Sequence, residues 1–235
     1  MAVLIGTSGY NYPEWRGSFY PSTFPTSKML AYYAERFSTV EINYTFYRMP
    51  NAKTIDGWQA GTPGGFCFAL KAPKRITHDA RLKNVAEPLT YFLDTARRLG
   101  GKLGPILFQL PPNFKKDLGR LEDLLGQLPP DLRYAFEFRH PSWFADDVYA
   151  HLRGTNAALC IADTEQGTTP LVATGDFGYL RLRDTGYSET DLGEWRATLA
   201  RLGSAWRDTF VYFKHEESGV GPALTRALDS VLQAS

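Results

Sequence analysis

The sequence has few cysteines and no long hydrophobic run, and both absences narrow its class. Its two cysteines, Cys67 and Cys160, lie inside apolar, strand-like runs, which indicates buried thiols in a reducing compartment and not a disulfide framework. No uninterrupted apolar run approaches the roughly 18 residues that a membrane span needs. The start, MAVLIGTSGY, lacks the basic and apolar regions of a secretory signal. We therefore expect a soluble, cytoplasmic protein with no membrane partner.

Charge of one sign and the usual cofactor motifs are also missing. The net charge is +1, so no overall basic field attracts the chain to nucleic acid. The four histidines show no HxH or HExxH spacing, and the sequence has no Walker-type loop or G-x-S-x-G elbow. No cofactor is evident. A divalent metal held by Glu41, Glu137 and Asp163 stays an alternative, although nearby arginines would compete for the same oxygens.

What the sequence does have is an alternation of short strand patterns with amphipathic helical patterns, which is typical of parallel βαβ units. The strand-like runs cover residues 3–8, 39–44, 66–71, 105–110, 134–139, 157–163, 178–183 and 209–214. This count predicts a TIM-barrel-like (β/α)8 fold, formed as a single domain over residues 1–235. Residues 164–176 show no helical period, so we expect a loop in place of the sixth helix.

The main alternative is an open, doubly wound α/β sheet. Such a sheet would want a glycine-rich phosphate loop and a helix directly after the first strand. Here GTSGY is followed by NYPEWRGSFYP, an aromatic loop that contains proline. This pattern favours the barrel.

Polar residues interrupt the strands near their C-terminal ends. Period-2 alternation puts Glu137 on one face with Arg139, while Phe136 and Phe138 occupy the other face. If the apolar face packs on helices, the polar face lines the barrel mouth, where active sites of this fold lie. The same argument applies to the other polar residues at strand ends: Glu41, Asn43, Lys71, Gln109, Asp163, Arg181, Arg183 and Lys214. Ion pairs that only fill the interior are the competing interpretation.

Five segments follow one another as in a known family. They are IGTSGYNYPEWRGSFYP, FSTVEINYTFYRMP, TPGGFCFALKAPKRITHDARL, LGPILFQLPPNF and FEFRHPSW. Over nearly its whole length the chain resembles the YecE-like family, domain of unknown function 72. The resemblance implies a TIM-barrel-like fold and no particular reaction. The final strand departs from the family pattern, because FKHEESGVG replaces an asparagine-rich turn, so Lys214 and His215 inherit no role.

Cations outnumber acids at the predicted mouth. The five cations are Lys71, Arg139, Arg181, Arg183 and Lys214, and they face the three acids Glu41, Glu137 and Asp163. Arginine binds phosphate and carboxylate groups through two parallel hydrogen bonds. The excess of positive charge therefore predicts an anionic small molecule or a nucleic-acid fragment as the partner, with Asn43 and Gln109 as further binding residues.

Aromatic residues crowd the loops above the same strand ends. Those predicted to contact a ligand are Tyr10, Trp15, Tyr47 and Trp143. Rings between cations can stack on a base or a sugar. Rings in loops also cap barrels by packing on one another, and this alternative stays open.

Four residues are candidates for acid–base chemistry. They are Glu41, Glu137, Asp163 and His140. Arg139 beside Glu137 favours an ionised carboxylate there, which suits a base or an orienting group. His140 titrates near neutrality in its ordinary state, but as the residue before Pro141 it can equally shape a turn.

Three functional hypotheses follow from these patterns. The first is an enzyme, a hydrolase or isomerase, that acts on a phosphate-bearing substrate such as a nucleotide, a sugar phosphate or a nucleic-acid end. The second is a non-catalytic module that binds single-stranded nucleic acid on the aromatic rim. The third is a metal-dependent barrel hydrolase or isomerase.

Overall fold

Eight parallel strands close into a barrel in the computed structural model, which describes residues 2–184, 186–217 and 219–234. The strands are β1 (Ala2–Ser8), β2 (Thr39–Ile42), β3 (Cys67–Lys71), β4 (Leu103–Gln109), β5 (Tyr134–Glu137), β6 (Ala158–Thr164), β8 (Phe177–Leu182) and β9 (Asp208–Phe213). Closure comes from the parallel pairs β5–β6 and β1–β9. The (β/α)8 prediction is confirmed, and the open-sheet alternative is wrong.

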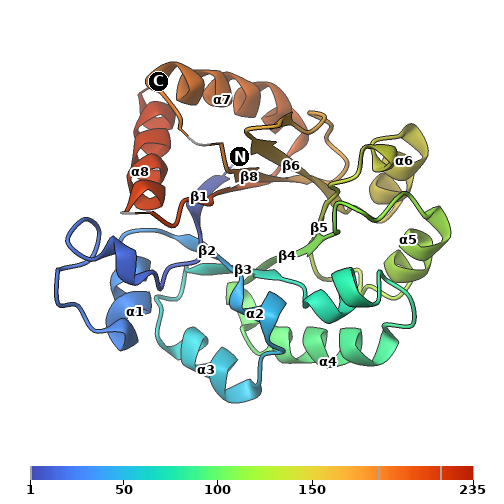
Figure 1. The fold of residues 1–235 in the computed structure, drawn as a ribbon, viewed down its shortest axis with the longest axis horizontal. Helices are drawn as coiled ribbons and strands as arrows, with labels where there is room; N and C mark the ends of the chain where they lie inside the picture. The colour runs from blue at the N-terminus through green and yellow to red at the C-terminus, as the bar shows by residue number, and fades with distance from the viewer. Residues whose placement is uncertain (1, 185, 218, 235) are drawn as a thin grey trace.

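Helices surround the strands (Figure 1). They are α1 (Met29–Ala34), α2 (Tyr44–Tyr47), α3 (Ala52–Ala60), α4 (Ala86–Arg97), α5 (Leu118–Leu125), α6 (Asp146–Gly154), α7 (Glu189–Leu202) and α8 (Val220–Gln233). Side-chain caps begin several of them: Asn51 accepts from Thr54 N at 2.9 Å, and Ser188 forms a capping box with Asp191. None of the helices within the described residues is long and apolar enough to cross a bilayer.

The segment after β6 differs from the other connections, as predicted. Residues 165–176 contain no helix; instead β7 (Gly167–Thr168) pairs antiparallel with the end of β6, with Asp163 opposite Thr168. Thr174 closes the far end of the loop, because its hydroxyl accepts from Leu159 N and donates to Ala157 O, both at 2.7 Å. The loop is therefore anchored at both ends to the side of β6.

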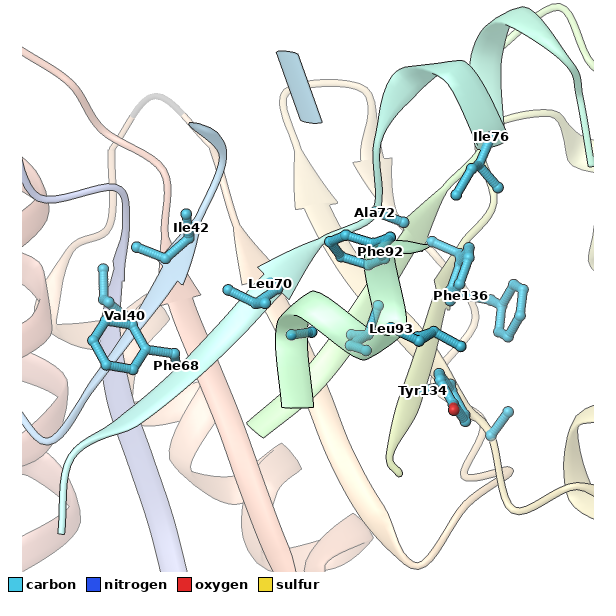
Figure 2. Close-up of a cluster of buried hydrophobic side chains, with 14 of the residues drawn as sticks. Val40, Ile42, Phe68, Leu70, Ala72, Ile76, Phe92, Leu93, Tyr134 and Phe136 are labelled. Carbon is cyan, nitrogen blue, oxygen red and sulfur yellow. The ribbon is translucent and has the colours of Figure 1, made fainter. Parts of the chain in front are cut away.

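Side chains that face the helices form the larger apolar core, and Figure 2 shows part of it. Val40, Ile42, Phe68 and Leu70 on β2 and β3 and Phe136 on β5 belong to one buried cluster. Phe92 and Leu93 of α4 complete it from the helix layer (Figure 2). Alternate residues therefore point away from the barrel axis, as the period of a strand requires.

The residues between them fill the barrel. Its interior cluster holds Ala69, Leu107, Ala135, Ala158, Cys160, Phe177, Tyr179, Phe210 and Tyr212. The next inward positions toward the strand ends are polar: Lys71 follows Ala69 and Arg181 follows Tyr179. Both aromatic and small residues are needed here, since a closed eight-stranded barrel is just wide enough for its own side chains.

Gly6 permits β1 and β2 to approach closely. A methyl group at Gly6 would collide with the Thr39 carbonyl oxygen, which is backbone and cannot rotate away. We expect Gly6→Ala to lower the free energy of unfolding by about 1–3 kcal/mol, the usual cost of overpacking. Gly57→Ala in α3 is the matched control, because a methyl there meets nothing within 4 Å. Equal denaturation midpoints for the two variants would contradict this account.

Candidate active site at the barrel mouth

Arg181 is the centre of the polar layer, and it is completely engaged. Its Nη1 donates to Glu137 Oε2 at 2.5 Å, and its Nη2 donates to Glu41 Oε1 at 2.9 Å. Weaker contacts join Nε to Glu41 Oε1 at 3.2 Å and Nη2 to Ser8 Oγ at 3.3 Å. The side chain is 1% exposed. Arg181 therefore links two acids across the barrel and has no free edge for a ligand, which corrects its predicted role in anion binding.

Glu41 receives a complete set of partners. Besides Arg181, it accepts hydrogen bonds from the Ser8 hydroxyl and from Tyr179 Oη, the latter at 2.6 Å. Burial works to raise the pKa of the Glu41 carboxyl, but Arg181 and these two hydroxyls outweigh it and hold the pKa below its ordinary value. An ionised, fully bonded carboxylate orients its neighbours and is a poor proton donor.

Glu137 differs from Glu41 because its two oxygens have different surroundings. Oε2 accepts from Arg181 and from Gln109 Nε2, the latter at 2.9 Å. Oε1 has no hydrogen-bond partner among the described residues, although Arg139 Nε lies 3.6 Å away and Arg183 Nη2 4.0 Å away. Burial raises the pKa of Glu137, yet Arg181 and Arg183 lower it to about 2. One oxygen of a permanently ionised carboxylate thus faces two arginines across a gap.

Arg183 likewise has a nitrogen without a hydrogen-bond partner among the described residues. This nitrogen is Nε, which is buried. Burial lowers the pKa of its guanidinium, and Arg181 and Arg139 lower it further against the opposing effect of Glu137. The lowering therefore comes mainly from the removal of the guanidinium from water.

A cavity of about 510 Å³ opens beside these two arginines. Its polar wall includes Glu137, Arg139 and Arg183, and the opposite wall is the β6–β7 hairpin with Thr164, Gln166, Gly167 and Thr168. The volume is in the range of sites for small organic ligands. Because no helix follows β6, room is left for a cavity at this side of the mouth.

Lys71 ends β3 on the other side of the mouth. It is 7% exposed, and its Nζ lies 4.0 Å from the centre of the Phe46 ring. His78 packs edge-on against the same ring, with centres 4.8 Å apart. Burial, followed by the positive charges of Lys71 and Arg139, lowers the pKa of His78 to about 4, so its imidazole is neutral at neutral pH.

Lys214 and Asn43 complete the polar layer. Lys214 follows Tyr212 in the inward phase of β9, and its Nζ lies 3.9 Å from Glu216 Oε1. Burial and then Arg181 lower its pKa. Asn43 Nδ2 donates to Ser8 Oγ at 2.7 Å and so joins the Glu41 network.

Two predicted acid–base residues lie outside the mouth. Asp163 follows Ile161 in the outward phase of β6, and it accepts from Thr168 at 2.5 Å and from Tyr187 at 2.9 Å. His140 begins a short turn, where its Nδ1 accepts from Ser142 N at 3.2 Å. The prediction that Asp163 lines the mouth with Glu137 is therefore wrong, and His140 shapes a turn, the alternative that the sequence left open.

The aromatic rim is mostly packing. Trp15 and Trp143 are 0% exposed, and each indole NH donates to a backbone carbonyl, of Glu216 at 3.0 Å and of Phe114 at 2.7 Å respectively. Neither tryptophan offers a face to a ligand, which corrects their assignment as binding residues. Tyr10 and Tyr47 line two other cavities, of about 330 Å³ and 510 Å³, away from Arg139 and Arg183.

Ser8 and Tyr179 were missed by the sequence interpretation. Both bind Glu41 from neighbouring inward positions, Ser8 at the end of β1 and Tyr179 two residues before Arg181. The period-2 rule that selected Arg181 also selects Tyr179. Tyr179 was not selected because a tyrosine in a strand is usually assigned to packing, and the hydrogen bonds of its hydroxyl group are then overlooked.

The carboxylates do not assemble into a metal centre. Among the described residues, no group of three or more His, Cys, Asp or Glu side chains is placed to hold a metal ion. Glu41 and Glu137 are joined through Arg181, and Asp163 points to the other side of its strand. The donor set proposed from the sequence for a divalent cation therefore does not form.

Comparison with known proteins agrees with the fold. The UPF0759 protein YecE of Escherichia coli K12 is 32% identical over 165 residues, a match that covers 67% of this chain and 58% of YecE. The crystal structure of a DUF72 family protein from Thermotoga maritima has a TM-score of 0.83 and 27% identity, with 97% of each chain covered. D-psicose 3-epimerase from Clostridium cellulolyticum has a TM-score of 0.55 and 14% identity, with 98% of this chain and 96% of the epimerase covered, a likeness of fold alone.

The family model described as protein of unknown function DUF72 matches residues 4–235, almost the full length of the barrel. The family resemblance found in the sequence motifs is thereby confirmed. This chain belongs to the DUF72 family, a group of TIM-barrel proteins.

Proposed function

We propose that this chain is an enzyme that binds a small phosphate-bearing substrate at the barrel mouth, with Arg139 and Arg183 as the anion-binding pair. One observation carries the proposal. Both arginines face Glu137 Oε1 from 3.6 Å and 4.0 Å, too far for hydrogen bonds, and both line the cavity of about 510 Å³. Their donors are thus available to oxygens that enter the cavity.

Charge supports the same proposal. With Asp163 outside the mouth, Glu41 and Glu137 are the acids of the polar layer, and Arg181 binds both. Arg139 and Arg183 then face a single carboxylate oxygen, Glu137 Oε1, whose companion Oε2 already binds Arg181. A phosphate dianion supplies the missing negative charge, and its oxygens fit guanidinium forks.

The cavity size narrows the substrate class. A volume of about 510 Å³ suits a sugar phosphate or a ligand of similar size, and the hairpin side supplies hydroxyl and backbone groups at Thr164, Gly167 and Thr168. A sugar 3-epimerase of similar fold was crystallised with D-tagatose, which is a precedent for a sugar ligand on such a fold.

The proposal predicts a selective loss of phosphate affinity. Arg139→Gln and Arg183→Gln should each weaken binding of inorganic phosphate or a sugar phosphate by about ten-fold or more, since each removes charge-assisted hydrogen bonds. Isothermal titration calorimetry at fixed salt measures this. Arg97→Gln is the control, because Arg97 is exposed and pairs with Asp131 on the outer surface. Unchanged affinity in both mouth variants, with wild-type binding present, would overturn the proposal, and so would the absence of wild-type binding.

A further inference from the structure

Lys71 is a buried amine whose contacts differ from those of every other cation in the polar layer. Among the described residues its Nζ contacts the face of the Phe46 ring, 4.0 Å from the ring centre. The acids nearest in the network, Glu41 and Glu137, hold Arg181 instead. The residue is 7% exposed, so its side chain is largely removed from water.

The surroundings of Lys71 favour the neutral amine. Burial lowers its pKa most, Arg181 and Lys214 lower it further, and Glu41 and Glu137 oppose them, with a result of about 7. At neutral pH about half of the Lys71 amines are then unprotonated, against about one in 2,500 for an ordinary lysine. The neutral amine is the nucleophilic form, and burial beside other cations is a known way to activate it.

We propose that Lys71 forms an imine with an aldehyde or ketone carbonyl of the substrate. The Nζ lone pair attacks the carbonyl carbon, the electrons of the C=O π bond move to oxygen, and one of the two amine protons transfers to that oxygen. The resulting carbinolamine loses its hydroxyl group and the remaining amine proton as water, which leaves a C=N bond. No oxidant or reductant is needed. Since the anion pair Arg139 and Arg183 would orient such a substrate, this inference rests on the proposed function and specifies its substrate as a carbonyl-bearing phosphate ester.

His78 and Phe46 suit this step. His78 packs on the same ring as Lys71 and is a neutral imidazole at neutral pH, so it places no further positive charge beside the amine. The Phe46 ring excludes water from one side of the amine, which slows hydrolysis of the imine.

Reductive trapping tests the inference on the unmodified full-length chain. The protein is incubated with dihydroxyacetone phosphate and sodium cyanoborohydride, and tandem mass spectrometry then locates the reduced adduct. Lys71 is expected to be labelled at least ten-fold faster than Lys74, an internal control three residues away whose side chain is 53% exposed. Labelling of Lys71 should rise with pH to a plateau just above 7. Equal rates at the two lysines, or faster labelling of Lys74, would overturn the inference.

A second probe separates this inference from the proposed function. Glycolaldehyde has the carbonyl group but no phosphate. If Lys71 is selectively labelled by glycolaldehyde while inorganic phosphate neither binds nor competes, the reactive lysine stands and the anionic substrate falls. If phosphate binds through Arg139 and Arg183 but no carbonyl probe labels Lys71, the imine falls and phosphate binding stands. Lys71→Met, which fits the same space, should lose the fast adduct.

Discussion

Arg181→Met is expected to lower the free energy of unfolding by about 3–5 kcal/mol at pH 7, the usual cost of removing one partner from a buried ion pair. Glu41 and Glu137 are 0% exposed, and Arg181 is the cation that both of them contact by hydrogen bonds. Without it, two ionised carboxylates are left in the barrel interior. Methionine fills much of the volume, so the loss reports mainly on charge.

The deficit of Arg181→Met should shrink as the pH falls. In the wild-type protein the pKa of Glu137 is about 2 and that of Glu41 is also lowered, so both carboxylates stabilise the fold above their unfolded pKa and lose this effect in acid. In the variant the loss of Arg181 raises both pKa values, because burial is then offset by fewer charges, so protonation of the carboxylates relieves the destabilisation. Urea denaturation at pH 7.5 and pH 5 should therefore give a smaller difference at pH 5.

Two controls make this prediction specific. Adding Glu41→Gln and Glu137→Gln to Arg181→Met should recover much of the lost stability, because neutral amides need no counter-ion. Arg97→Met removes an arginine from an exposed pair with Asp131 and should change stability little. A difference between Arg181→Met and wild type that is independent of pH would point to lost packing instead, and would contradict the charge argument.

The sequence pattern located the residues of this network but not which of them form hydrogen bonds with one another. Period-2 alternation alone placed Glu41, Glu137 and Arg181 on one inner face, and the structure has them in contact. Which acid Arg181 binds depends on the order in which β2, β5 and β8 surround the axis. That order follows from closure of the whole barrel, and no local pattern contains it.

The sequence-based assignments of Asp163 and of the two tryptophans to the mouth were wrong for different reasons. Asp163 was chosen because it ends a strand, although the inward series Ala158, Cys160 and Ala162 already assigns it to the opposite face. The alternation of inward and outward residues along a strand can be read from the sequence, and it predicts the direction of a side chain better than closeness to the end of the strand does. For Trp15 and Trp143 no such signal exists, since loops have no period, and burial against Phe19 and Phe138 appears only in three dimensions.

The charge state of Lys71 also lies beyond the sequence. Its neighbours come from β2, β5, β8 and the segment after β9, each distant along the chain. A strand-end lysine was therefore interpreted as an anion-binding ammonium, the ordinary state of that side chain. The structure keeps Lys71 at the mouth but buries it, and burial lowers its pKa more than any neighbouring charge does.

Lys71→Met is accordingly expected to stabilise the fold, and by more at pH 7 than at pH 10. The folded pKa of about 7 lies below the ordinary 10.5, so between these values the unfolded chain binds a proton that the folded chain lacks. Wild-type stability therefore rises with pH across this window, whereas methionine removes the dependence. The full shift is an upper limit because water reaches the mouth, and we expect a gain of about 2 kcal/mol at pH 7 that falls toward zero at pH 10.

Paired denaturation curves of wild type and Lys71→Met at pH 7, 8.5 and 10 measure this difference, in which the titration of other groups cancels. Lys74→Met is the control and should show no such trend, since Lys74 lies in an exposed position. A gain that is equal at all three pH values would indicate better packing on Phe46 and no shifted amine. A gain confined to lower pH would instead mean that the chain retains a destabilising lysine at its barrel mouth, a cost that natural proteins carry where a side chain is needed for function.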